Sequence, residues 1–296
     1  MLGDEGHNAD WTPPQFRAFL LLNRSEVGVQ VKEEPLDGGL TFRNCWQETH
    51  GIRLYRHGEQ KANMIQSGSM CGRYRLSRRK DLLAECFDVE PDDDWEPRYN
   101  IAPTQNVPVI RQHTEQPKRL ASRMRWGLIP FWSKDASIGF KMINARAETV
   151  ATKPAFRESL RKRRCLIPAD GFYEWKREGK AKQPFNFSMH DDSIFAFAGI
   201  WDRWKNPQGE VIETCSIITT TPNALLIDIH DRMPVILPLK HYDLWLDPGF
   251  QKAEAVCDLL KPFDPALMRR YEVSNRVNLI KNDDPEGAEP SSRNLR

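Results

Sequence analysis

The chain has 296 residues, of which 40% are hydrophobic and 28% are charged, and its formal net charge is +2. This composition excludes a chain that is disordered throughout, and it supplies enough apolar side chains for one sizeable core. No apolar run reaches the roughly 18 residues that a membrane-spanning helix needs. The early run at residues 19–22 lacks the length and flanks of a secretory signal, so we expect a cytoplasmic protein without a membrane partner.

Residues 1–69 are predicted to be an extension and not a domain. Their apolar residues follow no sustained period, and turn formers such as Pro13-Pro14 and Gly38-Gly39 interrupt every candidate element. The segment ends in small and polar residues at positions 66–69, which resemble a linker. Much clearer patterning begins at Met70.

Short strand patterns dominate residues 70–282, which we expect to form a single domain. Strands are predicted at residues 107–110, 120–126, 165–167, 184–189, 194–200, 215–221 and 235–237. Helices are predicted at about residues 80–86, 152–163, 239–246 and 251–260. The mixture indicates an α+β fold, with a curved, mainly antiparallel sheet or a partly closed barrel and flanking helices. Residues 283–296, which hold Pro, Gly, Glu and Ser, are predicted to be a disordered tail.

The cysteines and the charges say little about partners by themselves. The six cysteines include no C-x-x-C pair and no tight His/Cys cluster, so we expect neither a zinc site nor a disulfide scaffold, and no cofactor. Residues 1–69 hold 7 Lys and Arg against 9 Asp and Glu, which leaves 36 against 32 in the remainder. This mildly basic balance permits a polyanionic partner without requiring one.

Six short blocks of sequence carry the strongest functional signal. They are Met70-Cys71-Gly72-Arg73-Tyr74, residues 99–103 (Tyr-Asn-Ile-Ala-Pro), 124–130 (Met-Arg-Trp-Gly-Leu-Ile-Pro), 143–148 (Ile-Asn-Ala-Arg-Ala-Glu), 169–175 (Ala-Asp-Gly-Phe-Tyr-Glu-Trp) and 228–234 (Asp-Ile-His-Asp-Arg-Met-Pro). Each block is similar to a motif of the SOS-response-associated peptidase (SRAP) family, and the blocks follow the family's order. The resemblance implies a protein that captures abasic sites in single-stranded DNA covalently, through Cys71.

The family's chemistry explains why a cysteine would come first in the chain. A 1,2-aminothiol condenses with an aldehyde and closes a thiazolidine ring through its sulfur, and an abasic deoxyribose offers an aldehyde when its ring opens. An ordinary α-amine has a pKa of about 7.7–8.0, so it is substantially available near neutral pH. Without the matching blocks, Cys71 would be interpreted as a small buried apolar residue.

The resemblance makes three further residues catalytic. Glu174 lies among aromatic residues, where desolvation would suit it to proton transfer during sugar-ring opening and crosslink reversal, although an isolated glutamate is usually an exposed carboxylate. His230 can protonate the sugar oxygen or stabilise the imine, with Asp228 or Asp231 to orient it, although a lone loop histidine is more often structural. Asn144 can hold the reacting groups, unless its amide only stabilises a turn.

Five other residues are expected to contact DNA. The resemblance makes Arg73, Arg146 and Arg232 phosphate contacts, because guanidinium groups match phosphate oxygens. Trp126 and Trp132 offer flat surfaces to bases, where stacking contributes roughly 1–3 kcal/mol per base. For Trp126 a place in the core is an equally good interpretation, whereas Trp132, followed by Ser-Lys-Asp, is expected to be exposed.

The chain departs from the family in one respect, because 69 residues precede Met70. An internal Cys71 has an amide nitrogen in place of an amine, so it cannot form the imine. We favour a translation start at Met70, with cleavage before Cys71 or a true extension with altered activity as alternatives.

Two other functions use the same residues. One is an N-terminal-nucleophile hydrolase, in which the thiol of Cys71 attacks an amide and its own amine acts as the base. The other is a damaged-DNA-binding module without covalent chemistry. For the covalent function we expect a monomer, associated with the nucleoid in a bacterial cell.

Overall fold

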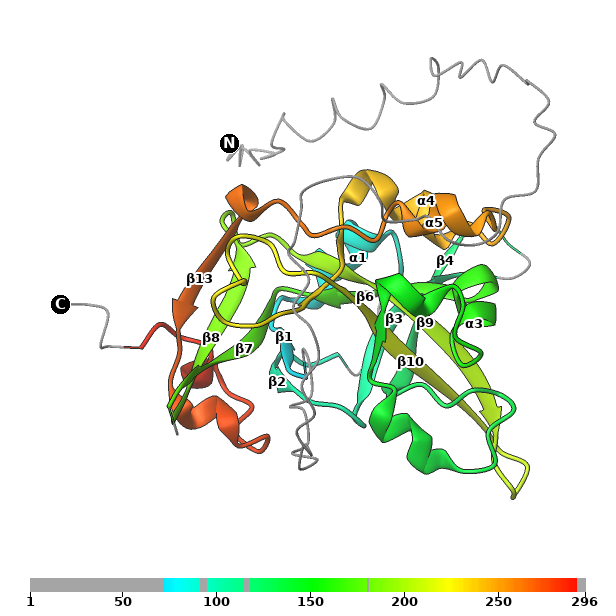
Figure 1. Cartoon of the computed structure of the whole chain (residues 1–296), viewed down its shortest axis with the longest axis horizontal. Coiled ribbons are helices and arrows are strands. Elements are labelled where there is room, and N and C mark those ends of the chain that lie inside the picture. Colours follow the sequence, from blue (N-terminus) through cyan, green and yellow to red (C-terminus); the bar gives the residue numbers. More distant parts are fainter. Residues whose placement is uncertain (1–71, 91–94, 114–115, 117, 180, 292–296) are drawn as a thin grey trace, which may run out of the picture. The chain divides into compact units, whose positions relative to one another are not determined.

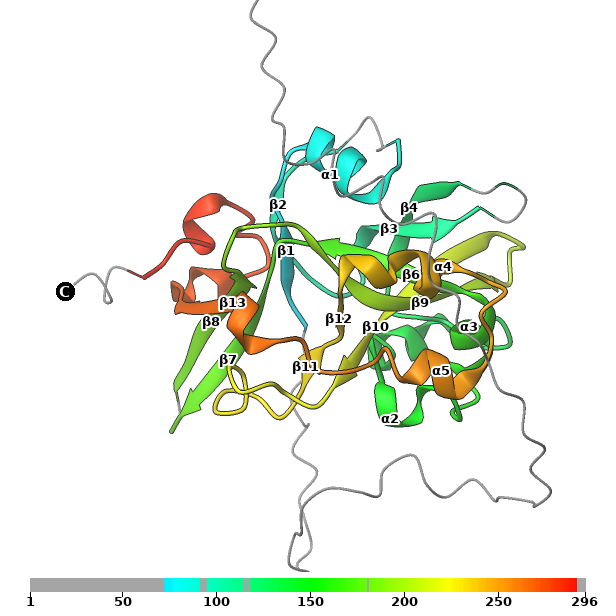
Figure 2. The same ribbon diagram turned by 90° about the horizontal axis from the view of Figure 1, so that it is seen from above.

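The computed structural model describes residues 72–90, 95–113, 116, 118–179 and 181–291, and within them strands predominate. The predicted extension at residues 1–69 and its boundary lie outside the described residues. Figure 1 shows the strands as two groups, with β7, β8 and β13 on one side and β3, β4, β6, β9 and β10 on the other. The two short strands β1 and β2 lie between these groups, as the view from above in Figure 2 also shows.

The first sheet is antiparallel and has the strand order β13-β8-β7-β1-β2. Its members are β1 (Tyr74–Leu76), β2 (Arg98–Ile101), β7 (Gly171–Glu178), β8 (Ala181–Met189) and β13 (Met268–Glu272). Tyr74 pairs with Phe172, and the backbone N–H of Tyr173 donates to the carbonyl of Arg73 at 3.0 Å. The residues just before β1 therefore continue along β7.

The second sheet closes on itself through five strands. These are β3 (Asn106–Gln112), β4 (Arg119–Trp126), β6 (Arg164–Ala169), β9 (Phe195–Lys205) and β10 (Val211–Thr220). Their order is β10-β4-β3-β6-β9, and β9 pairs again with β10, so the strands form a small barrel. All of these pairings are antiparallel except β4 with β10, which is parallel.

Three very short strands extend this barrel. β5 (Asn144–Arg146) runs parallel to β10, β11 (Met233–Pro234) pairs antiparallel with the end of β10, and β12 (Ile236–Leu237) pairs with β9. Strands of two or three residues bury little surface of their own. Their positions follow from backbone hydrogen bonds to the long strands β9 and β10.

The helices are short and flank the strands, as Figures 1 and 2 show. The α-helices are α1 (Lys80–Phe87), α2 (Ala147–Val150), α3 (Arg157–Lys162), α4 (Tyr242–Leu246) and α5 (Ala253–Cys257). The 3-10 helices are η1 (Ala136–Lys141), η2 (Leu239–His241), η3 (Pro265–Leu267), η4 (Asn275–Asn278) and η5 (Pro285–Gly287). Several helices are shorter than predicted, because turns interrupt the apolar patterns on which the predictions rested.

The core joins the first sheet to the barrel. Tyr74 on β1 is 1% exposed, and its ring makes edge contacts with Trp126 and Phe197, at centroid distances of 5.4 and 5.7 Å. Trp245 on α4 is fully buried and donates from Nε1 to the carbonyl of Cys165 at 2.9 Å. The α+β prediction with a partly closed barrel is thus confirmed.

The prediction of a disordered tail was wrong for residues 283–291. The carboxylate of Asp283 accepts hydrogen bonds from the backbone N–H groups of Tyr99 and Asn100 and from the guanidinium of Arg98. Further along, η5 follows, and Pro290 bridges Val273 on an adjacent segment. A composition typical of disorder is overridden here by polar contacts with β2. Residues 292–296 lie outside the described residues.

Candidate active site

The end of β10 brings two of the sequence blocks together. In the β5–β10 pairing Ile217 lies opposite Asn144 and Thr219 lies opposite Arg146, while in the β10–β11 pairing Thr219 lies opposite Pro234. Residues 143–148 and 228–234 therefore lie on either side of one strand end. Parallel and antiparallel partners at the same position of β10 explain how blocks about 85 residues apart become neighbours.

A bidentate ion pair ties these two blocks to each other. The guanidinium of Arg232 donates from Nη1 and Nη2 to the two carboxylate oxygens of Glu148, at 2.6 and 2.9 Å, and Nη2 also donates to the carbonyl of Thr219 at 2.6 Å. Burial alone would raise the pKa of Glu148, but the hydrogen bonds and the charge of Arg232 outweigh it and lower that pKa. Arg232 is only 8% exposed.

His230 is held by the backbone of the same arginine. Its Nδ1 accepts a hydrogen bond from the N–H of Arg232 at 3.0 Å, and Oδ1 of Asp231 lies 3.0 Å from the same nitrogen. Burial lowers the pKa of His230, and the positive charges of Arg177 and Arg232 act in the same direction against the opposing charge of Asp231. Burial therefore favours the neutral form of the imidazole.

Of the two carboxylates expected to orient His230, only Asp231 lies beside it. Asp228 instead pairs with Arg270, at 2.5 Å from Nη1, and lies 3.6 Å from the ammonium of Lys176. Arg270 also donates to the carbonyl of Leu225 at 2.6 Å. Asp228 thus fastens the loop that carries His230 to β13 and β7.

Glu174 is buried in the middle of β7, with an exposed fraction of 2%, and pairs in register with Phe185. The residue before it, Tyr173, donates from its hydroxyl to the carbonyl of Tyr99 at 2.8 Å, and burial raises the pKa of this phenol. The backbone hydrogen bond from Tyr173 to Arg73 places the segment that starts at Gly72 alongside β7, the strand that carries Glu174. Cys71 itself lies outside the described residues.

The guanidinium of Arg73 is partly buried and bonds to other parts of the protein. It donates to Oδ1 of Asn100 and to the carbonyl of Val277, both at 2.8 Å, and to the carbonyl of Asn278 at 3.3 Å. It also lies over the ring of Trp175, at 6.0 Å from the centroid. Burial lowers the pKa of Arg73. This arginine anchors the start of β1 to η4, and its expected contact with a phosphate stays a prediction.

Arg232 also bonds to the protein, because Glu148 and Thr219 accept from its guanidinium, and its expected phosphate contact likewise stays a prediction. Trp126 is not a stacking surface. It is 1% exposed, and its Nε1 donates to the carbonyl of Ile143, which precedes Asn144, at 2.9 Å. The wide apolar ring fills the core, and its single donor supports β5 from inside. Arg146, by contrast, is exposed at the end of β5.

Trp132 is exposed, at 51%, on a loop whose backbone is held on both sides. The N–H of Phe131 donates to the carboxylate of Asp202 at 3.1 Å, and Nε1 of Trp204 donates to the carbonyl of Ser133 at 2.7 Å. Asp202 is buried, and this burial raises its pKa despite the nearby Arg163. The sequence blocks gave no signal for Asp202 or Trp204, because these residues act through backbone groups of another segment.

Sequence reasoning also passed over Phe140, which is 62% exposed on η1 with the guanidinium of Arg125 at 5.7 Å from its ring. Glu148 was in a recognised block, but its pairing with Arg232 could not be anticipated.

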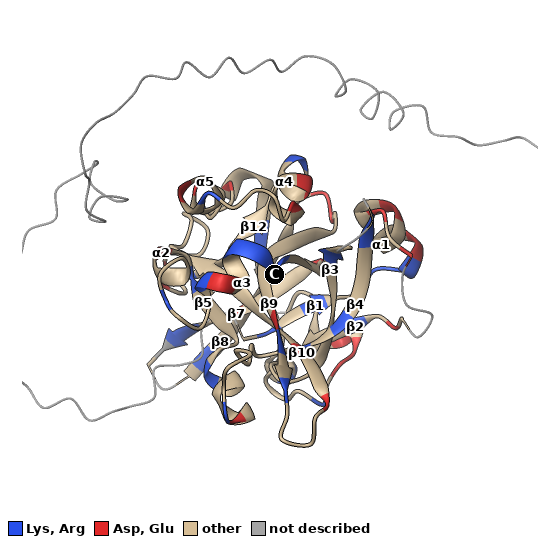
Figure 3. Cartoon of the chain, turned by 90° about the vertical axis from the view of Figure 1, so that its right-hand side faces the viewer, with Lys and Arg blue, Asp and Glu red and all other residues tan. Residues whose placement is uncertain are grey.

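Basic and acidic residues are interspersed on the face shown in Figure 3. Attraction of a polyanion to that face would therefore depend on individual exposed cations.

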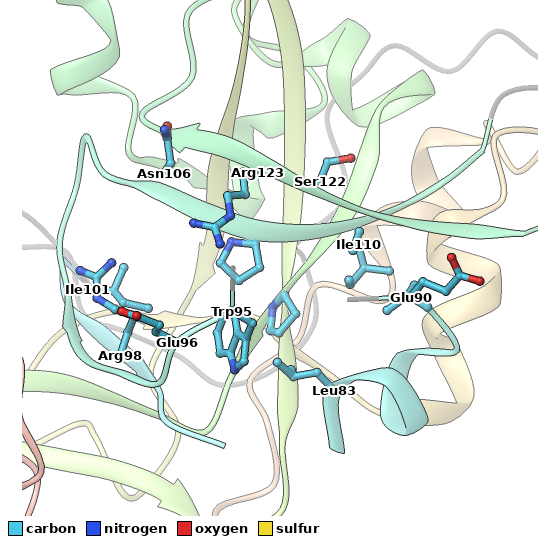
Figure 4. A pocket seen from close by; sticks show the side chains of 14 residues that line it. Leu83, Glu90, Trp95, Glu96, Arg98, Ile101, Asn106, Ile110, Ser122 and Arg123 are labelled. Atoms are coloured by element: carbon cyan, nitrogen blue, oxygen red, sulfur yellow. The ribbon is translucent and has the colours of Figure 1, made fainter. Parts of the chain in front are cut away.

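A pocket of about 420 Å³ lies elsewhere, between α1 and strands β2, β3 and β4. Figure 4 shows Trp95, Arg98, Ile110 and Arg123 around it. It holds none of the expected catalytic residues.

Among the described residues, no three His, Cys, Asp or Glu side chains are grouped so that they could hold a metal ion. No helix of the described chain is long and apolar enough to cross a membrane.

Comparisons with known proteins agree on one family. The model of the family described as "SOS response associated peptidase (SRAP)" matches residues 70–280. The abasic site processing protein YoqW of Bacillus subtilis is 47% identical over 221 residues, which cover 73% of this chain and 98% of the relative. The abasic site processing protein HMCES of Rattus norvegicus is 34% identical over 271 residues, covering 75% of this chain and 76% of the relative.

A solved structure is similar as well. A crystal structure of a protein from Bacteroides thetaiotaomicron matches with a TM-score of 0.68 and 33% sequence identity, over 75% of this chain and 100% of the other. Since YoqW is matched over 98% of its length, a region equivalent to this one makes up almost a whole protein there.

Proposed function

Because the chain belongs to the SOS response associated peptidase family, we propose that it binds single-stranded DNA and crosslinks itself to abasic sites through Cys71 when that residue is first in the chain. One observation supports this most directly. His230, the ion pair between Glu148 and Arg232, and Asn144 gather at the end of β10, in the blocks that the family motifs share. The names of the relatives add that abasic sites are what such proteins process.

The proposed reaction joins two groups of one residue to one carbon. The α-amine of Cys71 attacks the aldehyde carbon of the ring-opened deoxyribose, and the adduct loses water to give an imine. The sulfur then bonds to the same carbon, and the proton of the thiol passes to nitrogen, which closes the thiazolidine ring. The product is protein plus DNA less one water, and reversal takes that water back.

Each proposed catalytic residue has a place that suits its step. His230, with its pKa lowered by burial, donates a hydrogen bond from Nε2 to the ring oxygen of the closed sugar as the ring opens. Glu174, buried on β7 beside the entering segment, moves protons on and off the reacting atoms. Asn144, on β5, orients the sugar or the aminothiol. Exposed Arg146 and Trp132 contact a phosphate and a base of the strand.

A direct experiment tests the crosslink. The chain beginning at Cys71 is incubated with a single-stranded oligonucleotide that carries one abasic site, and the products are separated under denaturing conditions. We expect a shifted band whose mass equals protein plus DNA less one water, and its loss in the Cys71→Ala variant. No shifted band for the unaltered protein, or an unchanged band for Cys71→Ala, would refute the proposed function.

A further inference from the structure

We propose that Glu148 is a positioning residue, which fixes the neutral tautomer of His230 with its proton on Nε2 by holding Arg232 in place. The inference rests on the proposed function for its meaning in catalysis. Glu148 itself is not proposed to contact the reacting atoms. Its effect passes through Arg232, whose side chain meets Glu148 and whose backbone meets His230.

The first step is the rigidity of the ion pair. Arg232 makes a fork with both oxygens of Glu148 and a third bond to the carbonyl of Thr219. Thr219 pairs with both β5 and β11, so the guanidinium is tied to the point where three strands meet. Glu148 lies in the first turn of α2, which directly follows β5. Neither the arginine side chain nor its backbone can rotate without breaking several bonds together.

The second step is the bond to the imidazole. The N–H of Arg232 points at Nδ1 of His230 at 3.0 Å, and only a ring whose Nδ1 carries a lone pair can accept it. In the neutral ring this places the proton on Nε2. The charged groups that face the ring are Asp231, at 3.0 Å from Nδ1, and the cations Arg177 and Arg232. A protonated ring would donate from Nδ1 to Asp231 and lose the bond from Arg232.

The third step is what the tautomer provides. A histidine that accepts at Nδ1 can donate only from Nε2, so its donor faces away from Arg232 and is available to an oxygen of the substrate. The opposite tautomer would put a lone pair at Nε2 and could not donate a hydrogen bond to the sugar oxygen. Glu148 also supplies a negative charge to Arg232, which weakens that arginine as a phosphate ligand. This leaves the phosphate contact to exposed Arg146.

Glu148→Gln tests the inference, since glutamine keeps the shape of the side chain but cannot accept from both guanidinium nitrogens. Crosslinking rates are measured at increasing concentrations of abasic oligonucleotide, in the chain that begins at Cys71. We expect the rate at saturating DNA to fall about 10-fold or more, while the half-saturating DNA concentration stays the same. Nitrogen NMR of the imidazole should show Nε2 protonated in the unaltered protein and a mixture of tautomers in the variant.

Two further variants make the result specific. Arg232→Lys keeps a positive charge and the backbone N–H but removes the fork, so it should change the rate and the tautomer as Glu148→Gln does. Glu213→Gln is the control. Glu213 lies on β10 like Thr219, but roughly 20 Å away along the strand. Its carboxylate accepts from Arg203 at 2.8 Å and from Arg111 at 3.4 Å. Glu213→Gln should change neither the crosslinking rate at saturating DNA nor the tautomer of His230.

An unchanged saturated rate together with an unchanged tautomer in both Glu148→Gln and Arg232→Lys would overturn the inference. So would a loss of DNA affinity with an unchanged saturated rate, since that outcome would make the pair a DNA contact. If the unaltered protein forms no crosslink at all, the proposed function fails, but the NMR signals still decide whether Glu148 fixes the tautomer of His230. A variant that does not fold is replaced by the other of the pair.

Discussion

The three arginines of the sequence blocks differ in how many of their donors the protein itself occupies. Arg73 and Arg232 each make three hydrogen bonds to carbonyl, amide or carboxylate oxygens, and the cost of burying a guanidinium is offset by those bonds. Arg146 remains exposed on β5. A phosphate would have to displace protein acceptors to reach the first two, whereas it can reach Arg146 at no such cost.

Charge reversal at Arg146 should therefore weaken DNA binding more than reversal at other exposed arginines. We expect Arg146→Glu to raise the Kd for single-stranded DNA about 10-fold, and the slope of log Kd against log salt to lose about 0.7 for the lost phosphate contact. Fluorescence anisotropy over a salt series measures both. Arg203→Glu is the matched control, because Arg203 is an exposed arginine of β9 that pairs with Glu213 near the start of β10. Equal effects of the two variants would contradict the assignment.

The lowered pKa of His230 also has a consequence for stability. The folded protein resists protonation of this ring, so the unfolded chain binds the extra proton first as the pH falls through about 6.5. The free energy of unfolding should thus decrease below that pH, and it should decrease less in His230→Gln, which has no proton to take up. Urea unfolding at pH 7.5 and 5.5 makes the comparison.

The contribution of His230 to the free energy of unfolding changes in a different pH range from the contributions of the carboxylates. Glu148 and Asp228 have lowered pKa values, so their contributions are lost only as the pH falls toward about 4 and below. Identical pH dependence in the unaltered protein and His230→Gln would show that the ring is not held neutral by the fold.

The residues of the site could be named from the sequence, but their roles could be assigned only in part. The blocks identified Asn144, Glu174 and His230 because short motifs preserve the type and order of such residues. They could not separate Arg146 from Arg73, because the acceptors of Arg73 include backbone carbonyls some 200 residues away. Backbone oxygens have no signature in a sequence, and so structural and ligand-binding arginines look alike there.

At the scale of elements, strand length explains part of what the sequence could predict, although the eight-residue strand β7 was also missed. The long strands β9 and β10 carry enough apolar residues to show a pattern, and both were predicted. β1, β5, β11 and β12 have two or three residues each and form because a longer neighbour offers hydrogen bonds. No periodicity can be detected in so few residues, so β1, β5 and β11 were missed, whereas the predicted strand at residues 235–237 includes β12.

The segment after β13 is the clearest case of an element made by contacts. The amide of Asn100, which is 1% exposed, donates to the carbonyls of Val277, Leu279 and Asn282 at 3.0–3.1 Å, and its oxygen accepts from Arg73. A single buried side chain thus satisfies several backbone groups of a segment that has no sheet of its own. It also joins that segment to the arginine next to Gly72.

Removing this amide should loosen the segment. We expect Asn100→Ala to lower the free energy of unfolding by about 1–3 kcal/mol, because buried carbonyls and the guanidinium of Arg73 lose their partner. Asn282→Ala is the control, since its amide donates to the carbonyl of Arg276 at an exposed site, and it should cost much less. Urea denaturation measures both. Crosslinking by Asn100→Ala should fall as well, and a variant with unaltered stability and rate would contradict the role given to Asn100.

At the scale of the whole molecule, the residues proposed for catalysis come from both sheets. Glu174 and the segment at Gly72 and Arg73 belong to the first sheet, whereas Asn144 and the His230 loop surround the end of a barrel strand. The two sheets are joined through the buried ring of Tyr74 and through Asp170, the residue between β6 and β7, which lies 3.7 Å from Arg75. Motif order along the chain predicts membership of this site, and only the fold shows which members meet.

The position of Cys71 in the chain should decide whether this assembled site reacts. In the full chain Met70 is bonded to the nitrogen of Cys71, and an amide nitrogen is not basic enough to form an imine. We expect the full chain, its length verified by intact mass, to give no denaturation-resistant band with abasic DNA, while the chain beginning at Cys71 does. Acetylating the amine of the shorter chain should abolish its band and leave its DNA affinity intact. Equal crosslinking by the full chain would show that the amine is dispensable and that the sulfur alone attacks the sugar.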